Sequence, residues 1–222
     1  MPTITQAQLQ NEQAYDLNGS GDETYTPSKA VLIKSISTNI SKSFNSIIAG
    51  LLIGLGVIIN TQTQPPILGA LLFSFGLLTI IHLKLPLFTG KIGYLEGPLP
   101  LILFFNFVGI TLVFYGYCIS NPDYYTILEQ IATIKFSKTY LEMLFGGIFC
   151  GMLIHFAVKC KVPHLTSMAV ILFILIGAEH CVADFPYLLT VFSWNNLIKL
   201  GLVILGNSIG AIFIERSIIN NA

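Results

Sequence analysis

Long apolar stretches separated by short polar ones dominate the chain from about residue 44 onward. A transmembrane helix needs about 20 apolar residues to cross about 30 Å of hydrocarbon, and six stretches come near that length. They cover residues 44–60, 66–82, 98–119, 141–159, 164–192 and 196–216. The pattern therefore predicts an all-α membrane protein with six transmembrane helices.

Two of the predicted spans, the second and the fifth, are interrupted by residues that do not suit a helix in hydrocarbon. The second runs into HLKLPLFTGKIGYLEGP, which contains Lys84, Pro86 and Lys91, and the fifth contains GAEHCVAD at residues 177–184. Non-helical backbone at membrane depth is tolerated only where it is buried in protein or lines a cavity. Two broken spans therefore indicate a transport pathway rather than a simple anchor.

The breaks fall in the second span of each group of three, which suggests an internal repeat. The first span of each half carries glycines four residues apart, in AGLLIGLG and in GGIFCGM. The third spans match as well, because Asn106 and Gly109 are spaced like Asn207 and Gly210. With three spans in each half, the halves have opposite orientations, which is the inverted-repeat plan of channels and secondary transporters.

The polar ends of the chain and its basic residues set the predicted domains and topology. Residues 1–43 lack the features of a signal peptide and are predicted as a polar cytoplasmic segment, with a short amphipathic helix over about 27–42. Residues 44–216 form the transmembrane domain, and residues 217–222 form a short C-terminal tail. A cytoplasmic N-terminus puts eight basic residues on that side and three outside, which fits the positive-inside rule. The eight are Lys29, Lys34, Lys42, Lys84, Lys91, Lys159, Lys161 and Arg216, and the three are Lys135, Lys138 and Lys199.

Composition supports this class and excludes others. Hydrophobic residues make up 54% of the chain, charged residues only 10%, and the mean hydropathy is +0.76. A soluble domain would lack enough charge to cover its surface, so we expect membrane lipid around the protein. The sequence has no basic region that suggests nucleic acid. Its four cysteines show neither CxxC spacing nor a secreted disulfide pattern, and we expect them to be small apolar fillers.

The interrupted fifth span holds the most informative ionisable residue, His180. An ionisable group within a span is costly and by default marks a pathway or a proton relay, with a structural hydrogen-bonded histidine as the alternative. We expect Glu179 to bind backbone amides of the break or to orient the imidazole. We expect Asp184 to cap the helix that resumes at Phe185. In the other break, Thr89 offers a hydroxyl that can donate or accept a hydrogen bond.

Large apolar residues upstream of both breaks can form constrictions that gate by dewetting. The candidates are Phe73, Leu77 and Phe173. A membrane enzyme that uses Glu179, His180 and Asp184 as metal ligands or acid–base groups is disfavoured. Glu179 and His180 are adjacent rather than at helical ligand spacing, and no second ligand cluster accompanies them. We therefore expect no enzymatic activity, no metal and no cofactor.

Three motifs taken together resemble the formate/nitrite transporter family, which includes hydrosulfide and lactate relatives. They are LFTG at 87–90, EHCVADFPY at 179–187 and LGNSIGA at 205–211, and the resemblance runs from about residue 44 to residue 216. It implies an aquaporin-like protomer in a homopentamer, each protomer with its own pore. It also implies a multi-pass protein of the cell membrane with both termini in the cytoplasm.

The resemblance also implies roles for individual residues. The central histidine of the family corresponds to His180, and the threonine of the first broken loop corresponds to Thr89. The lysine before the fourth span corresponds to Lys135, with Lys138 as a competing alignment. The hydrophobic constrictions correspond to Phe73, Leu77 and Phe173.

The expected function is a channel or transporter that moves a small weak-acid anion with a proton. Lys135 and Lys138 attract the anion, its proton affinity rises in low dielectric, and the neutral acid crosses the constrictions. His180 either donates the proton or stays neutral and supplies a selective hydrogen bond. Formate, nitrite, hydrosulfide, lactate and acetate remain open as permeants, because the chain departs from the family at Gly151, Cys181 and Asp184. The alternative is an aquaporin-like channel for water or glycerol, although the chain lacks paired Asn-Pro-Ala motifs.

Overall fold

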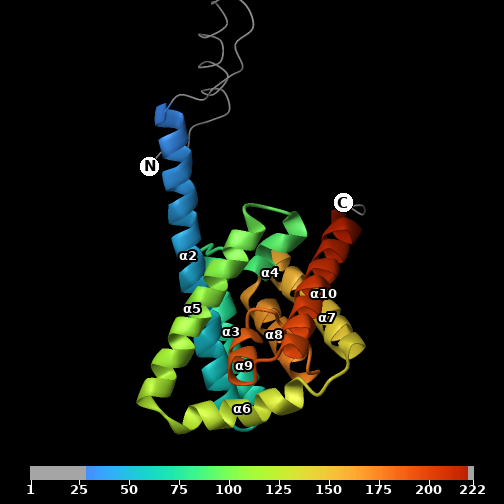
Figure 1. Cartoon of the computed structure of the whole chain (residues 1–222). Coiled ribbons are helices and arrows are strands. Elements are labelled where there is room, and N and C mark those ends of the chain that lie inside the picture. The colour runs from blue at the N-terminus through green and yellow to red at the C-terminus, as the bar shows by residue number, and fades with distance from the viewer. Residues whose placement is uncertain (1–28, 220–222) are drawn as a thin grey trace, which may run out of the picture. The chain divides into compact units, whose positions relative to one another are not determined.

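A computed structural model describes the backbone of residues 29–219 and the side chains of residues 44–218. Of the polar segment predicted over residues 1–43, residues 1–28 lie outside the described residues. The chain divides into two compact units, residues 1–38 and 39–222, and the helices after α2 belong to the second. The regular elements of the described backbone are all helices, and it contains no strand (Figure 1). Its elements are α2 (Lys29–Gln62), α3 (Pro66–His82), α4 (Phe88–Lys91), η1 (Ile92–Tyr94), α5 (Leu99–Ser120), α6 (Asp123–Lys135), α7 (Tyr140–Cys160), α8 (Pro163–Leu175), α9 (Phe185–Thr190) and α10 (Trp194–Ile219).

The apolar runs of the sequence become helices at nearly the predicted positions. Four helices are long and apolar enough to cross a membrane: residues Phe44–Gln62 of α2, together with α5, α7 and α10. The apolar helices α3 and α8 are shorter, with 17 and 13 residues. The short helices α4 and α9 follow them after non-helical segments, so both predicted interruptions are present. The prediction of an all-helical membrane protein is confirmed.

Local sequence explains where several helices begin. Proline occupies the first turn of α3, α5 and α8, where its missing N–H has no helical partner to lose. At α7, Thr139 and Glu142 form a capping box. The Glu142 amide donates to Thr139 Oγ1 at 3.3 Å, and the Thr139 amide donates to Glu142 Oε2 at 2.6 Å. This pair satisfies two amides that would otherwise lack partners at the start of the helix.

Helix α2 packs on α5, and α7 packs on α10, through contacts that repeat between the two pairs. A Cβ atom added to Gly50 would lie 2.1 Å from the carbonyl oxygen of Asn106. One added to Gly151 would lie 2.3 Å from the carbonyl oxygen of Asn207. Only glycine permits so close an approach of two helical backbones.

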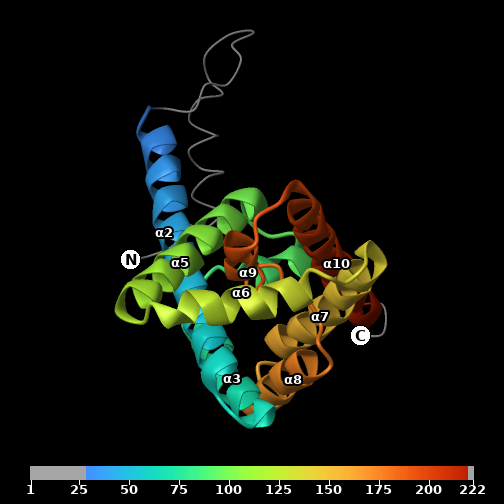
Figure 2. The same ribbon diagram turned by 60° about the horizontal axis from the view of Figure 1, so that its bottom comes forward.

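The remaining helices complete the described part of the second unit. Helix α3 packs on α8, and Ser74 Oγ donates to Ser167 Oγ at 3.1 Å across this contact. Helix α6, which the sequence analysis did not predict, contacts α5 and α9. Figures 1 and 2 both show α6 lying across the ends of the longer helices rather than running along them.

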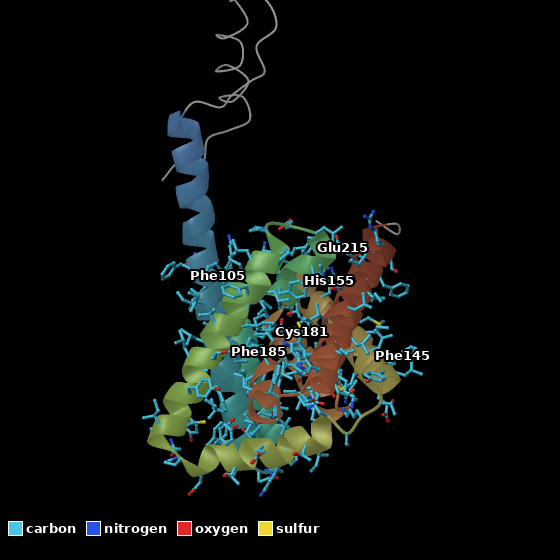
Figure 3. All side chains as sticks on the ribbon, in the orientation of Figure 1. Phe105, Phe145, His155, Cys181, Phe185 and Glu215 are labelled. Carbon is cyan, nitrogen blue, oxygen red and sulfur yellow. The ribbon has the colours of Figure 1, made fainter. Side chains whose placement is uncertain are left out.

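The distribution of polarity is that of a protein surrounded by lipid or by other copies. Large apolar side chains face outward, with Phe75 67% and Ile119 83% exposed. Figure 3 shows Phe145 projecting away from the helices, while Cys181 and His155 lie among them. Several polar side chains are fully enclosed, including Thr89, Asn106, His155, Glu179, His180 and Asn207. Buried polar groups require hydrogen-bond partners, and these partners define the candidate site.

Candidate functional site

The two interrupted segments meet through Thr89 and His180. Thr89 belongs to α4, and His180 lies in the non-helical stretch between α8 and α9. Thr89 Oγ1 and His180 Nε2 are 3.1 Å apart, and both side chains are buried. The structure therefore brings together two predicted site residues that are 91 positions apart in the sequence.

Hydrogen bonds occupy both ring nitrogens of His180. The Ala183 amide donates to Nδ1 at 3.2 Å, so this nitrogen accepts and carries no proton. In a neutral imidazole the proton then lies on Nε2, which donates to Thr89 Oγ1. The hydroxyl of Thr89 keeps its own proton available for another acceptor.

Aromatic side chains narrow the space next to this pair. The rings of Phe73 and Phe173 meet edge to face with centroids 5.9 Å apart, and Phe173 stacks on His180 at 6.1 Å. A cavity of about 120 Å³ is lined by these three side chains together with Lys135 and Asp184. Apolar walls this close to a histidine exclude water and strengthen any polar contact made there.

A second cavity has a volume of about 600 Å³. Leu77, Thr166 and Tyr94 line it, together with three lysines. The lysines are Lys84, Lys91 and Lys161. The three predicted constriction residues therefore divide between the two cavities, with Leu77 lining the larger and both phenylalanines the smaller.

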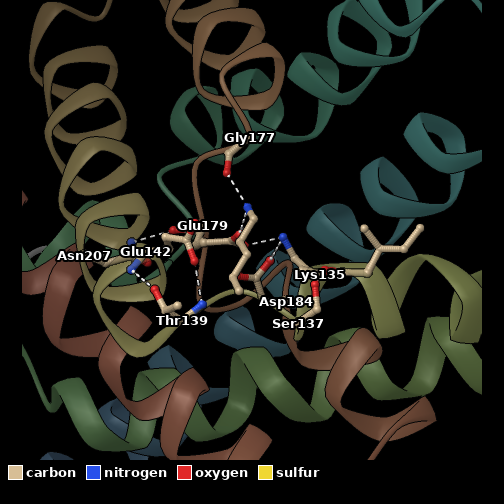
Figure 4. Close-up of polar contacts among 10 residues, drawn as sticks. Lys135, Ser137, Thr139, Glu142, Gly177, Glu179, Asp184 and Asn207 are labelled. Atoms are coloured by element: carbon tan, nitrogen blue, oxygen red, sulfur yellow. Dashed lines mark hydrogen bonds and ion pairs between the residues drawn. The ribbon is translucent and has the colours of Figure 1, made fainter.

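A buried ionic cluster lies beside the smaller cavity (Figure 4). Lys135 Nζ contacts Glu179 Oε2 and lies 3.0 Å from Asp184 Oδ1. Lys138 Nζ donates to Glu179 Oε1 at 2.5 Å and to the carbonyl oxygen of Gly177 at 2.9 Å. Burial alone lowers the pKa of Lys135, but the charges of Asp184 and Glu179 outweigh it and raise that pKa above its ordinary value. Lys135 therefore keeps its positive charge.

The second interrupted segment is held by Asn207 of α10. The Cys181 amide donates to Asn207 Oδ1 at 2.9 Å. Asn207 Nδ2 donates to the carbonyl oxygens of Gly147 and Glu179, both at 2.8 Å. One buried side chain thus satisfies backbone groups on both sides of His180, which fixes the imidazole in place.

Asn106 of α5 does the same for the first interrupted segment. The Phe88 amide donates to Asn106 Oδ1 at 2.9 Å. Asn106 Nδ2 donates to the carbonyl oxygens of Ser46 at 2.7 Å and Pro86 at 3.1 Å. The backbone on both sides of Leu87 is thereby anchored, next to Thr89.

Comparison with known proteins agrees with this arrangement. The family model described as formate/nitrite transporter matches residues 26–218 of the chain. The chain belongs to the formate/nitrite transporter family. As a member of this family it is a membrane channel or transporter, not an enzyme.

Two solved structures resemble this transporter. One, described as a pentameric formate channel with formate bound, is 16% identical, with a TM-score of 0.65 over 83% of this chain and 96% of its own. The other, described as an FNT family ion channel, is 20% identical, with a TM-score of 0.67 over 86% of this chain and 92% of its own. At these identities the likeness shows the fold. No curated protein matches the sequence.

Two predicted roles within the transporter's ionic cluster are wrong. Asp184 stands before α9, but its side chain makes no capping hydrogen bond and instead pairs with Lys135. Glu179 does not orient the imidazole, since its carboxylate binds Lys135 and Lys138. In both cases an ion pair with α6 outweighs the local interaction that adjacency in sequence suggested. The alternatives Lys135 and Lys138 both reach the cluster, although only Lys135 lines the smaller cavity.

A second buried ionic cluster of this transporter was not predicted from the sequence, and it is made by His155, Lys159 and Glu215. Glu215 Oε2 accepts from Lys159 Nζ at 2.8 Å and lies 2.7 Å from His155 Nε2. Tyr94 of η1 packs on the His155 ring at 4.9 Å. The signal was present, because His155 and Glu215 are ionisable residues inside predicted spans, like His180. The cluster ties η1 to α7 and α10.

Among the described residues, no group of three or more His, Cys, Asp or Glu side chains is arranged to hold a metal ion. Cys150 and Cys181 are buried free thiols, as expected for small apolar fillers. The chemistry that the polar side chains of this site offer is hydrogen bonding and ionic attraction. The groups that offer it are Thr89, His180 and the cluster around Lys135.

Proposed function

We propose that this transporter moves small monovalent weak-acid anions across the membrane together with a proton. The observation that carries the proposal is the 3.1 Å hydrogen bond between Thr89 and His180, which joins the two interrupted segments beside the smaller cavity. A hydroxyl and an imidazole N–H are the donors that a small acid group can use. Formate, nitrite, hydrosulfide and short monocarboxylates such as lactate and acetate are the candidate permeants.

The apolar walls argue for passage in the neutral form. A bare anion loses its hydration between Phe73, Phe173 and Leu77, whereas its conjugate acid loses far less. Lys135 lines the smaller cavity and keeps its charge, so it attracts the anion before the narrow part. The anion therefore gathers at the cavity, takes up a proton there and crosses the constriction as the acid.

His180 acts in this scheme as a neutral hydrogen-bond donor. The two hydrogen bonds to its ring nitrogens suit the neutral tautomer, and imidazolium formation would break the bond from the Ala183 amide. When a permeant arrives, the Nε2–H group of His180 and the hydroxyl of Thr89 donate hydrogen bonds to its acid group. Of the two roles expected from the sequence, the geometry favours the selective hydrogen bond over proton donation.

The wider architecture is part of the proposal. Helices α3 with α4 and α8 with α9 each make one interrupted crossing, giving six crossings in two inverted three-helix repeats and an aquaporin-like protomer. The matching contacts of Asn106 and Asn207, and of Gly50 and Gly151, support this repeat. The outward-facing apolar side chains and the pentameric relative support a homopentamer in the membrane.

The positions of the lysines support the predicted topology. Lys84, Lys91 and Lys161, all predicted to be cytoplasmic, line the larger cavity. Lys135, predicted to be external, lines the smaller one. In this scheme the larger cavity opens toward the cytoplasm, both termini are cytoplasmic, and the protein lies in the cell membrane.

The test is uptake of labelled formate by proteoliposomes at external pH from about 5 to 8, with the other candidate anions as competitors. Protein-free vesicles measure passive permeation of the acid. We expect saturable uptake that rises as pH falls, and a loss of about tenfold or more in His180→Asn with assembly intact. His164→Asn, at an exposed histidine on α8, is the matched control and should transport normally. Passage of water or glycerol without any weak acid would identify a neutral-solute channel instead.

A further inference from the structure

The carboxyl group of Asp184 is buried and only half satisfied. Its side chain lines the smaller cavity together with His180 and Lys135, and the residue is 2% exposed. Oδ1 lies 3.0 Å from Lys135 Nζ. Oδ2 has no hydrogen-bond partner among the described residues. A buried polar atom without a partner is uncommon and calls for an explanation such as a bound ligand or a proton.

The charges around Asp184 are shared unequally between two carboxylates. Glu179 pairs with both Lys135 and Lys138, whereas Asp184 pairs with Lys135 and shares a hydrogen bond with the Glu179 carboxyl group. Because two carboxylates that share one site cannot both stay ionised at low cost, the less compensated one takes up a proton first. Here the less compensated carboxylate is Asp184.

The other titratable groups near Asp184 offer it no further cation. Tyr187 comes from α9, Cys150 from α7, and Cys181 from the same interrupted segment. The Tyr187 ring lies 5.3 Å from Lys135 Nζ. His180 is the remaining ionisable neighbour, and its two nitrogens already hold hydrogen bonds. Asp184 Oδ2, in contrast, can lose or gain a proton while Oδ1 keeps its contact with Lys135.

We propose that Asp184 holds the proton that travels with the permeant, an inference that rests on the proposed function. An anion in the smaller cavity takes the proton from the Asp184 carboxyl group. The O–H bond on Oδ2 breaks, an O–H bond forms on the anion, and the electron pair stays on Asp184, which remains as a carboxylate beside Lys135. The neutral acid then passes Phe73 and Phe173. A hydronium ion that reaches the cavity through water then gives its proton to the Asp184 carboxylate and becomes water, and the reverse sequence operates for transport in the other direction.

Formate uptake by proteoliposomes carrying Asp184→Asn tests this step, because asparagine keeps the size of the side chain but holds no exchangeable acid proton. At pH about 7 we expect a loss of about tenfold or more, the scale on which a positioned acid contributes. The loss should shrink as pH falls toward about 5, because the solution then supplies the neutral acid itself. Acetate uptake should suffer less than formate uptake, since acetic acid is the weaker acid. Asp123→Asn, at an exposed aspartate, is the matched control.

The outcomes separate this inference from the proposed function. If the unaltered protein moves no weak acid, the proposed function fails. If it does move formate, and Asp184→Asn either transports normally at pH about 7 or is slowed equally at every pH and for both acids, only the role of Asp184 is overturned.

A second measurement covers the case in which the variant does not assemble. Infrared difference spectra of the unaltered protein, with aspartate labelled at the carboxyl carbon, should show a protonated aspartate band that decreases when formate is added. A spectrum without such a band would contradict the proposal. Asp123 is exposed and serves as the internal reference, since formate should not change its signal.

Discussion

Asn106 and Asn207 make equivalent sets of three hydrogen bonds, each to one amide and two carbonyl groups of the backbone. Both carboxamide side chains are fully buried, and each anchors one interrupted segment on its neighbouring helices. The two segments then meet through Thr89 and His180. The site is therefore held by two matching sets of hydrogen bonds. Loss of either set should displace both Thr89 and His180.

Replacing Asn207 by alanine should lower stability and transport together. The change leaves the Cys181 amide and two carbonyl groups buried without partners, at a cost of about 1–3 kcal/mol for each unsatisfied group. Thermal unfolding of the purified protein in detergent measures the effect. Asn121→Ala, at an exposed asparagine, should leave the melting temperature unchanged. If the Asn207→Ala protein is as stable as the control, Asn207 does not stabilise the interrupted segment.

Alanine at Gly151 should force α7 and α10 apart. The added Cβ would meet the carbonyl oxygen of Asn207 at 2.3 Å, a backbone atom that cannot turn aside. Gly201→Ala on α10 is the matched control, because no atom outside its own helix lies within 4 Å of its added Cβ. We expect a lower melting temperature for Gly151→Ala. The Gly201 variant should gain up to about 1 kcal/mol from the better helix propensity of alanine.

Thr89→Val should slow uptake while preserving the packing of α4. Valine has nearly the same shape as threonine but removes the hydroxyl that lies 3.1 Å from His180 Nε2. We expect a loss of about tenfold or more in weak-acid uptake, with Thr89→Ser restoring much of it. Thr79→Val, whose hydroxyl bonds only to the carbonyl oxygen of Phe75 in its own helix, provides the comparison. Equal rates in the two valine variants would exclude Thr89 from the pathway.

Lys135→Met should be strongly destabilising, and Asp184→Asn should partly rescue it. Removing the lysine leaves Glu179 paired with Lys138 alone, and it leaves Asp184 buried without a cation whenever that side chain has given up its proton. Breaking a buried pair in this way costs about 3–5 kcal/mol. The second substitution removes the charge that Asp184 then carries. A double-mutant cycle of unfolding free energies measures the coupling. Additive effects would show that the two side chains do not interact.

The long helices of this transporter could be predicted from the sequence because a helix that crosses the bilayer needs an apolar run of about 20 residues, which is rare in other structures. The stretch 66–82 matches α3, and the stretches 98–119, 141–159 and 196–216 agree with α5, α7 and α10 to within three residues. The stretch 44–60 is only the later part of α2, and the stretch 164–192 divides into α8 and α9. Helix α6 was missed, although Tyr124, Leu128 and Ala132 recur at helical spacing and are buried. Its other residues are mostly polar, so a search for apolar runs passes over it.

The site was only partly predictable. His180 and Thr89 were found because polar groups in broken spans are costly and therefore informative. The role of Asp184 was not predicted, because its position before a helix suggested a local cap. Its partner Lys135 lies about fifty positions earlier in the sequence. Adjacent residues reveal local hydrogen bonds, but ion pairs between distant segments depend on how the helices pack.

The ionic cluster also constrains the order in which the chain can be completed. Lys135 and Glu179 are 44 positions apart, so α6 has been synthesised well before its partner carboxylates exist. Until the segment around Glu179 has been made, Lys135 and Lys138 lack their carboxylate partner. The cluster thus closes late, when that segment packs against α6, and chains shortened before Glu179 should expose α6 to proteases.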